Sequence, residues 1–322
     1  MTADSTDPSY WLNWRFLLCA IWVLVGIVIA ALLIWRYEGR NKSRNKPNGN
    51  EEEAAGCLYK NEPWETCWKW IHPIWLLSYR IVAFSALLAL LLADIIIRGG
   101  GIFYFYTQWT FTLVTIYFGL GSLLSIHGCL RYCYDVEPER DSNVCTDAEH
   151  GSYVPLTLGE NEDTTIVTGN LDHYDEPNCR PAASVSGYTL QILFQMCAGS
   201  VVLTDSVFWF ILYPFFTAKD YRLSFLVVCM HSVNAVFLLG DAVLNSLRFP
   251  FFRIAYFALW TCVFVIFQWI IHACVSIRWP YAFLDLSSPY APLWYLAVGL
   301  LLFPCFGIFT LIFRIKQCYL SR

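Results

Sequence analysis

The sequence FLLCAIWVLVGIVIAALLIW, from Phe16 to Trp35, contains 20 residues and no charged side chain. At 1.5 Å per residue, an α-helix of this length crosses the ~30 Å hydrocarbon core of a bilayer. Because backbone polar groups find no partner in lipid, such a segment must be helical. Similar stretches follow, and we expect seven helices at about 15–36, 74–97, 102–127, 188–213, 222–247, 251–277 and 290–314. The chain is therefore predicted to be an all-α, polytopic transmembrane helix bundle.

The composition agrees with a membrane protein. Hydrophobic residues make up 57% of the chain and charged residues 14%, whereas soluble domains average about 25% charged residues. The net charge of −4 and the absence of a basic stripe indicate no nucleic-acid partner. Nothing in the sequence implies a metal, a nucleotide or another cofactor. The partners that we expect are membrane lipids.

The predicted organisation has one N-terminal anchor and a six-helix core. Residues 1–36 hold the N-terminal segment and the first helix, 37–73 a cytosolic polar loop, 74–315 the core, and 316–322 a cytosolic tail. The first helix is not read as a cleaved signal peptide. Its apolar run is longer than that of a signal peptide, and Asp4 and Asp7 precede it where basic residues belong.

A long acidic loop is predicted inside the core, at about residues 128–187. It carries twelve Asp and Glu residues against three Arg residues and has few aromatic side chains. A segment of this composition cannot bury enough apolar surface to order itself. We therefore expect it to be largely disordered.

The thirteen cysteines do not indicate a disulfide framework. Most lie in predicted helices or in loops placed in the cytosol, where thiols stay reduced. Cys129 and Cys133, with His127 and His150 nearby, could be read as a zinc site, but their spacing is loose. The alternative that we favour is lipid modification of cysteines beside helix ends.

The orientation in the membrane follows from the positive charges. With the N-terminus outside, fifteen Lys and Arg residues fall on the inner side and five on the outer side. Positive residues collect on the cytosolic side of membrane proteins, so we predict an external or lumenal N-terminus and a cytosolic C-terminus, in the plasma membrane or an endomembrane. Arg80, just within its helix, is expected to extend toward the inner face.

Polar side chains within the predicted helices are candidates for function, because they are costly in lipid. The ionisable ones are Asp94, Asp205, His231, Asp241 and His272, and the uncharged ones include Gln108, Asn234 and Gln268. At 1.5 Å per residue, Thr107 lies ~8 Å below the outer end of its helix, His231 ~13 Å and His272 ~9 Å. All except Asp241 therefore fall near one outer layer.

Each of these residues also has a structural explanation. Asp94 and Arg98 are four residues apart on one helix, so their opposite charges can neutralise each other. His231 and Asn234 share one helical face and could join two helices by hydrogen bonds. Their gathering at one depth favours a site instead. A threonine hydroxyl with a histidine base can attack an ester; Thr107 and His231 would fill these roles, supported by Asp205 or His272.

Three segments carry a family resemblance. FYTQWTF at 105–111 resembles the Tyr-Thr-x-Trp region of the rolling stone-like and androgen-induced membrane protein family. MHSVNA at 230–235 is similar to the helix of that family with a lone membrane histidine. WIHPIWLLSYR at 70–80 is similar to the entry to the core in plant members. The resemblance covers about residues 70–315 and implies a shared multipass fold.

The resemblance also implies an activity. Androgen-induced members are multipass threonine hydrolases that cleave fatty-acid esters of hydroxy fatty acids with one threonine and one histidine. By motif position these residues are Thr107 and His231 here, and the implied substrate is a fatty-acid ester. Gln108-Trp109 instead follows the rolling stone-like branch, which is associated with cell-surface or fusion roles. The additional N-terminal helix and the acidic loop depart from both branches.

Two other function classes remain open on the sequence. One is a non-enzymatic scaffold, receptor-like or lipid-binding membrane protein whose polar layer only binds a lipid. The other is a small-molecule or proton transporter, since Asp and His within helices also serve in relays. The sequence shows no repeated pattern of broken helices that would favour a transporter.

Overall fold

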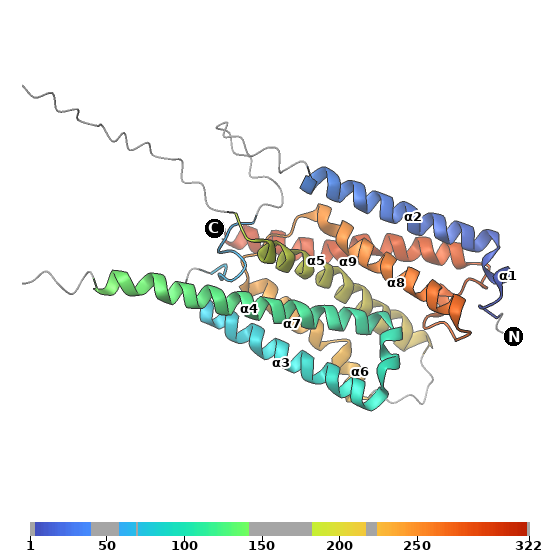
Figure 1. The fold of residues 1–322 in the computed structure, drawn as a ribbon, viewed down its shortest axis with the longest axis horizontal. Coiled ribbons are helices and arrows are strands. Elements are labelled where there is room, and N and C mark those ends of the chain that lie inside the picture. The colour runs from blue at the N-terminus through green and yellow to red at the C-terminus, as the bar shows by residue number, and fades with distance from the viewer. Residues whose placement is uncertain (1–3, 40–57, 69, 142–181, 217–223, 321–322) are drawn as a thin grey trace, which may run out of the picture.

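The computed structural model describes residues 4–39, 58–68, 70–141, 182–216 and 224–320 (Figure 1). The principal helices are α2 (Trp14–Ile34), α3 (Pro73–Arg98), α4 (Tyr106–Asp141), α5 (Val185–Val207), α6 (Phe225–Met230), α7 (Val233–Leu244), α8 (Ile254–Cys274) and α9 (Ala291–Leu320). The short elements are α1 (Pro8–Trp11), the π-helical η1 (Trp35–Gly39) and η4 (Phe208–Phe216), and the 3-10 turns η3 (Gly100–Tyr104), η5 (Phe251–Arg253) and η6 (Ala282–Leu284). In these ranges the only β-structure is two isolated bridges, Tyr59 with Ala182 and Thr66 with Asn245.

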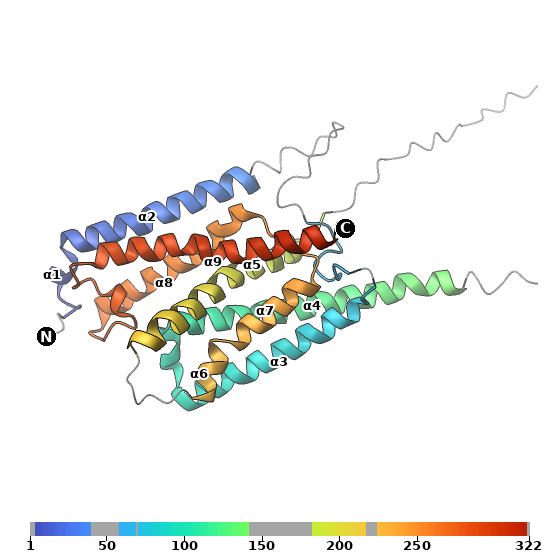
Figure 2. The same ribbon diagram turned by 180° about the vertical axis from the view of Figure 1, so that it is seen from behind.

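The predicted seven-span bundle is confirmed. Seven helical segments among the described residues are long and apolar enough to cross a membrane. Figures 1 and 2 show them side by side, with the N-terminus at one end of the bundle and the C-terminus at the other. We call the end that holds α1, η3 and residues 275–290 the pocket end, and the opposite end the C-terminal end. The chain is a polytopic α-helical membrane protein.

The first transmembrane helix lies on the outside of the bundle. Helix α2 packs against α8 and α9, and only Cys19 and Ala30 along it are buried. Its start is fixed by the Asn13 side chain, whose Oδ1 accepts a hydrogen bond from the Phe16 amide. Most of its surface therefore faces lipid in a membrane, which explains why nearly every residue in it is apolar.

Several helix boundaries differ from the sequence expectation. Helix α4 begins at Tyr106 rather than at 102, because Gly99 takes a positive φ of 77° and a 3-10 turn follows it. It also continues to Asp141, so residues 128–141 of the expected disordered loop are helical. Likewise, α9 extends to Leu320 and includes most of the expected tail. Residues 142–181 of the acidic loop lie outside the described residues, and its last residues, 185–187, belong to α5.

The described cysteines, ten in number, are all free thiols. Within the described ranges, no group of three or more His, Cys, Asp or Glu side chains could hold a metal ion. His150, one member of the zinc alternative, lies outside those ranges.

A buried charge network holds the C-terminal end of the core together. Arg80 is fully buried, and its Nε donates to Asp241 Oδ1 at 2.8 Å. The other carboxylate oxygen, Oδ2, accepts from the Tyr117 hydroxyl and from Asn245 Nδ2, the latter at 2.7 Å. Lys316 reaches the same region and donates to the Ala242 carbonyl at 2.8 Å. The expectation that Arg80 extends to the membrane face was wrong, because Asp241 offers it a buried partner.

Close packing of α5 on α8 depends on a glycine. A Cβ atom added at Gly199 would lie 2.4 Å from the buried Phe257 ring. Overpacking of this kind costs about 1–3 kcal/mol. We expect Gly199→Ala to lower the melting temperature of the detergent-solubilised protein. Gly307→Ala is the control, because an added Cβ there meets no heavy atom within 4 Å. An equal drop in melting temperature in both variants would contradict the idea that Gly199 is needed for the close approach of α5 to α8.

Candidate functional site

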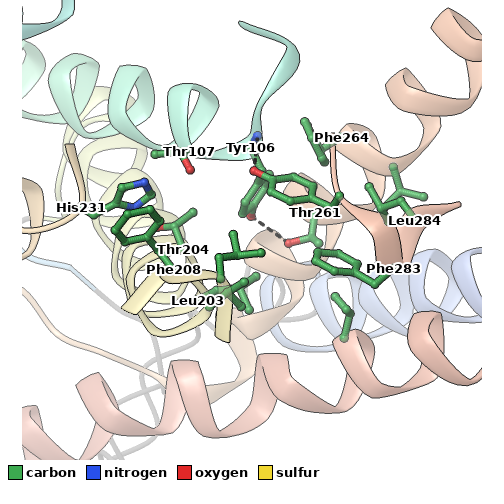
Figure 3. Close-up of a pocket in the computed structure, with 15 residues that line it drawn as sticks. Tyr106, Thr107, Leu203, Thr204, Phe208, His231, Thr261, Phe264, Phe283 and Leu284 are labelled. Atoms are coloured by element: carbon green, nitrogen blue, oxygen red, sulfur yellow. Dashed lines mark hydrogen bonds between the residues drawn. The ribbon is translucent and has the colours of Figure 1, made fainter. Parts of the chain in front are cut away.

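An apolar pocket lies between the helices at the pocket end of the bundle. About 580 Å³ of space in the pocket and at its mouth is not filled by protein atoms, part of it open to the surroundings. It is lined by Tyr106, Thr107, Leu203, Thr204, Val207, Phe208, Leu212, His231, Thr261, Phe264, Val265, Tyr281, Phe283, Leu284 and Val298. Figure 3 shows His231, Thr107 and Phe208 at one side and Phe264, Phe283 and Leu284 at the other. A flexible hydrocarbon chain would suit these walls.

Thr107 is the second residue of α4. The sequence pattern instead predicts a position more than one turn inside a helix that begins at residue 102. Other buried hydroxyls, such as those of Thr115 and Thr204, donate to the carbonyl four residues earlier. At Thr107 that carbonyl belongs to Phe103, outside the α-helix, and it accepts from the Trp109 indole at 2.8 Å. The Thr107 hydroxyl is therefore not committed to its own helix.

His231 stands at a break in the fifth span. The span expected at 222–247 is present, but it is interrupted, because helix α6 ends at Met230 and α7 begins at Val233. Because of the interruption, the His231 carbonyl lies outside the regular i to i+4 hydrogen bonding of the helix. The Trp209 indole donates a hydrogen bond to this carbonyl at 2.8 Å. The break thus places the imidazole at the wall of the pocket.

The His231 imidazole is held by neighbours from the fourth span. Its ring stacks on Phe208 with centroids 3.7 Å apart and an interplanar angle of 2°. Its Nδ1 lies 3.6 Å from Asp205 Oδ1, slightly beyond hydrogen-bond length. Catalytic hydrogen bonds are often long in unliganded structures and shorten when a substrate binds. Asp205 is therefore positioned to orient and stabilise the imidazole.

The fourth span also loses its regular geometry here. Helix α5 ends at Val207 and continues as the π-helical η4, which includes Pro214. Widened π-turns are frequent at functional sites. This one carries Phe208 and Trp209, which contact the imidazole and the backbone of His231. Two irregular segments from two spans therefore meet at His231.

Of the predicted site residues, the structure brings Thr107, His231 and Asp205 together and leaves His272 apart. His272 does not line the pocket. Its Nε2 is 2.7 Å from the Tyr104 hydroxyl, its Nδ1 is 2.7 Å from the Gln268 carbonyl, and its ring stacks on Trp279. These contacts join α8 to the segment that follows it.

Asp94, which the depth estimate placed in the same layer, also lies outside the lining. It pairs with Arg98 at 2.6 Å, as expected from their i,i+4 spacing, and accepts from Gln108 Nε2 at 2.8 Å.

The sequence reasoning missed several polar groups that line the pocket. The Tyr106 hydroxyl is 3.0 Å from Oγ1 of Thr261, which also lines the pocket, and 3.3 Å from Ser200 Oγ, which does not. Tyr281 comes from the connection between α8 and α9 and places its hydroxyl beside the start of α4. Tyr106 could have been found from its place next to Thr107. No sequence signal distinguishes Tyr281 from the other tyrosines near helix ends.

Comparison with protein-family models, with curated proteins and with solved structures finds no match for this chain. A hydroxyl and an imidazole on the wall of one apolar pocket, with a carboxylate beside the imidazole, are the groups needed for acyl transfer through a hydroxyl nucleophile.

Proposed function

We propose that this protein is a membrane-embedded lipid-ester hydrolase in which Thr107 is the nucleophile and His231 the general base. The observation that carries the proposal is that Thr107 and His231, from two spans, line one apolar pocket, with Asp205 beside the imidazole. A structural role for His231 alone would not require a hydroxyl at the same pocket. Asp205 has the supporting role of orienting the base.

The first step acylates the enzyme. The Thr107 oxygen attacks the ester carbonyl carbon, its proton passes to the His231 imidazole, and the π electrons of the carbonyl move onto oxygen. When the carbonyl re-forms, the bond to the alcohol oxygen breaks. That oxygen takes the proton from His231, and the alcohol leaves. The carboxylate of Asp205 stabilises the imidazolium between these two proton transfers.

The second step restores the enzyme. Water attacks the acyl-threonine carbonyl while His231 accepts one of its protons. Collapse of the tetrahedral intermediate breaks the bond to the Thr107 oxygen, which takes the proton back. The products are a carboxylic acid and the regenerated threonine, so water is the only co-reactant.

The proposed substrate is a fatty-acid ester of a hydroxy fatty acid. The apolar walls formed by residues such as Leu203, Val265 and Phe283 suit an acyl chain. The resemblance of residues 105–111 and 230–235 to the androgen-induced membrane protein family supports the same substrate class. With the N-terminus outside, as the positive charges favour, the pocket end would lie in the external or lumenal leaflet.

A covalent probe tests the proposal directly. A fluorophosphonate transfers its phosphonyl group to an activated hydroxyl and releases fluoride. We expect membranes containing the wild-type protein to be labelled at Thr107, located by mass spectrometry of the peptide, and labelling to vanish in Thr107→Ala and in His231→Ala.

Thr204→Ala is the matched control for this experiment. Thr204 also lines the pocket, but its hydroxyl is committed to the Ser200 carbonyl at 2.9 Å. Labelling should therefore persist in Thr204→Ala. Labelling that survives in folded Thr107→Ala would show that another hydroxyl reacts, and the proposed nucleophile would be wrong.

A further inference from the structure

Tyr281 reaches the wall of the pocket from a connection between two helices, and two aromatic rings hold its side chain. It belongs to the connection between α8 and α9, just before η6, and lines the pocket with Thr107. Its ring stacks on Phe283 with centroids 5.1 Å apart and an interplanar angle of 11°, and the ring of Phe105 packs edge-on against it at 6.3 Å. The two aromatic contacts fix the direction in which the side chain points.

The hydroxyl of Tyr281 meets the first turn of α4. The Tyr106 amide, which has no partner within its own helix, donates to Tyr281 Oη at 3.1 Å. The same oxygen lies beside both the amide and the hydroxyl of Thr107. Because Oη accepts a bond from the backbone, its own proton remains available to donate. The donor therefore lies next to the oxygen proposed to attack the ester.

We propose that the Tyr281 hydroxyl donates the hydrogen bond that stabilises the oxyanion during acylation of Thr107. This inference rests on the proposed hydrolase function. The oxyanion forms on the oxygen of the carbon that Thr107 attacks, so its donor must lie beside Thr107, as Tyr281 does. No proton is transferred in this role; the hydroxyl only strengthens its bond as negative charge develops.

The surroundings of Tyr281 suit a donor. Burial raises the pKa of the Tyr281 phenol above its usual value, so the group keeps its proton at neutral pH. A hydroxyl that accepts one hydrogen bond is polarised to donate a stronger one. The backbone bond from Tyr106 therefore both positions the phenol and improves it as a donor.

A purely structural role must be distinguished from this one. By accepting from the Tyr106 amide, Tyr281 also caps α4, and a lost cap lowers stability. Loss of a cap would reduce the amount of folded enzyme but would not change the turnover of each folded molecule. Loss of an oxyanion donor lowers kcat and leaves KM nearly unchanged, because the oxyanion exists only in the transition state.

The experiment compares turnover of a hydroxy-fatty-acid ester by purified wild type, Tyr281→Phe, Tyr281→His and Tyr104→Phe, each normalised to folded protein. Tyr281→Phe should lose about 100-fold or more in kcat with little change in KM. Tyr281→His keeps a ring and a donor and should retain more turnover than Tyr281→Phe. Tyr104→Phe is the control, since its hydroxyl bonds the Arg278 carbonyl at 2.9 Å and does not line the pocket.

The outcomes separate this inference from the proposed function. Turnover that requires Thr107 but stays within about threefold of wild type in Tyr281→Phe would overturn the role of Tyr281 and leave the nucleophile in place. Equal losses of kcat in the Phe and His variants would also overturn it, because a side chain that can donate would then be no better than one that cannot. A folded wild-type protein without turnover would overturn both proposals.

Discussion

Changing Thr107 and His231 to alanine together should reduce ester turnover scarcely further than either change alone. The proposed nucleophile and base form one catalytic unit. Without the imidazole the hydroxyl has no base to take its proton, and without the hydroxyl the imidazole has no nucleophile to activate. Once one member is gone, little chemistry remains for the other to lose. We expect each single variant to lose nearly all turnover and the double variant to match them.

The measurement is kcat/KM for a hydroxy-fatty-acid ester in the wild type, the two single variants and the double variant. Thr107→Ser adds a sharper comparison, because it keeps a hydroxyl and removes one methyl group, so measurable turnover should remain. If the two residues were only packing contacts, each change would cost roughly 0.6 kcal/mol of stability and functional losses would be partial and additive. That pattern, in well-folded protein, would remove both residues from catalysis.

The architecture could be predicted because a membrane restricts it so strongly. Uncharged runs such as Phe16–Trp35 leave the helix as the only solution in lipid, and their length fixes where each helix crosses. The structure accordingly has its seven spans within a few residues of the expected ranges over most of the chain. The exceptions occur at helix ends, as at Tyr106 and Leu320, where local turns and extensions decide the boundary.

The break in the fifth span could not be predicted from local sequence. Met230-His231-Ser232 contains neither Gly nor Pro, and the flanking residues continue the apolar run. What stabilises the break comes from another span: the Trp209 indole bonds the free carbonyl and Phe208 stacks on the imidazole. Propensity along one segment carries no information about such partners.

The candidate site could be predicted in part, for a geometric reason. Depth along the bundle axis can be estimated from residue number, and this estimate placed Thr107 and His231 in one layer. It also placed Asp94 and His272 there, and the structure shows that both bond other partners and do not line the pocket. Depth is one coordinate of three. Which side chains point into the same pocket depends also on how each helix is rotated and packed against its neighbours, and residue number does not give this.

The structure also predicts a large loss of stability in Asp241→Ala. Arg80 and Asp241 are both fully buried and are joined at 2.8 Å, and Lys316 brings a second positive charge to the same region. Removing the carboxylate leaves the Arg80 guanidinium without its counter-charge in a site that excludes water. Breaking a buried pair in this way typically costs about 3–5 kcal/mol.

A partly exposed pair supplies the control for this prediction. The side chains of Arg248 and Glu62 are 27% and 17% exposed where they pair at 3.3 Å, and exposed pairs contribute at most about 1 kcal/mol. Thermal unfolding in detergent should therefore show a much larger drop for Asp241→Ala than for Glu62→Gln, which removes the charge of a partly exposed pair. Because the deficit in Asp241→Ala comes from an unpaired charge, replacing Arg80 by Met in the same chain should recover part of it. A double variant less stable than Asp241→Ala would show instead that the bonds of Arg80 to the Pro63 carbonyl and the Ser125 hydroxyl outweigh the charge.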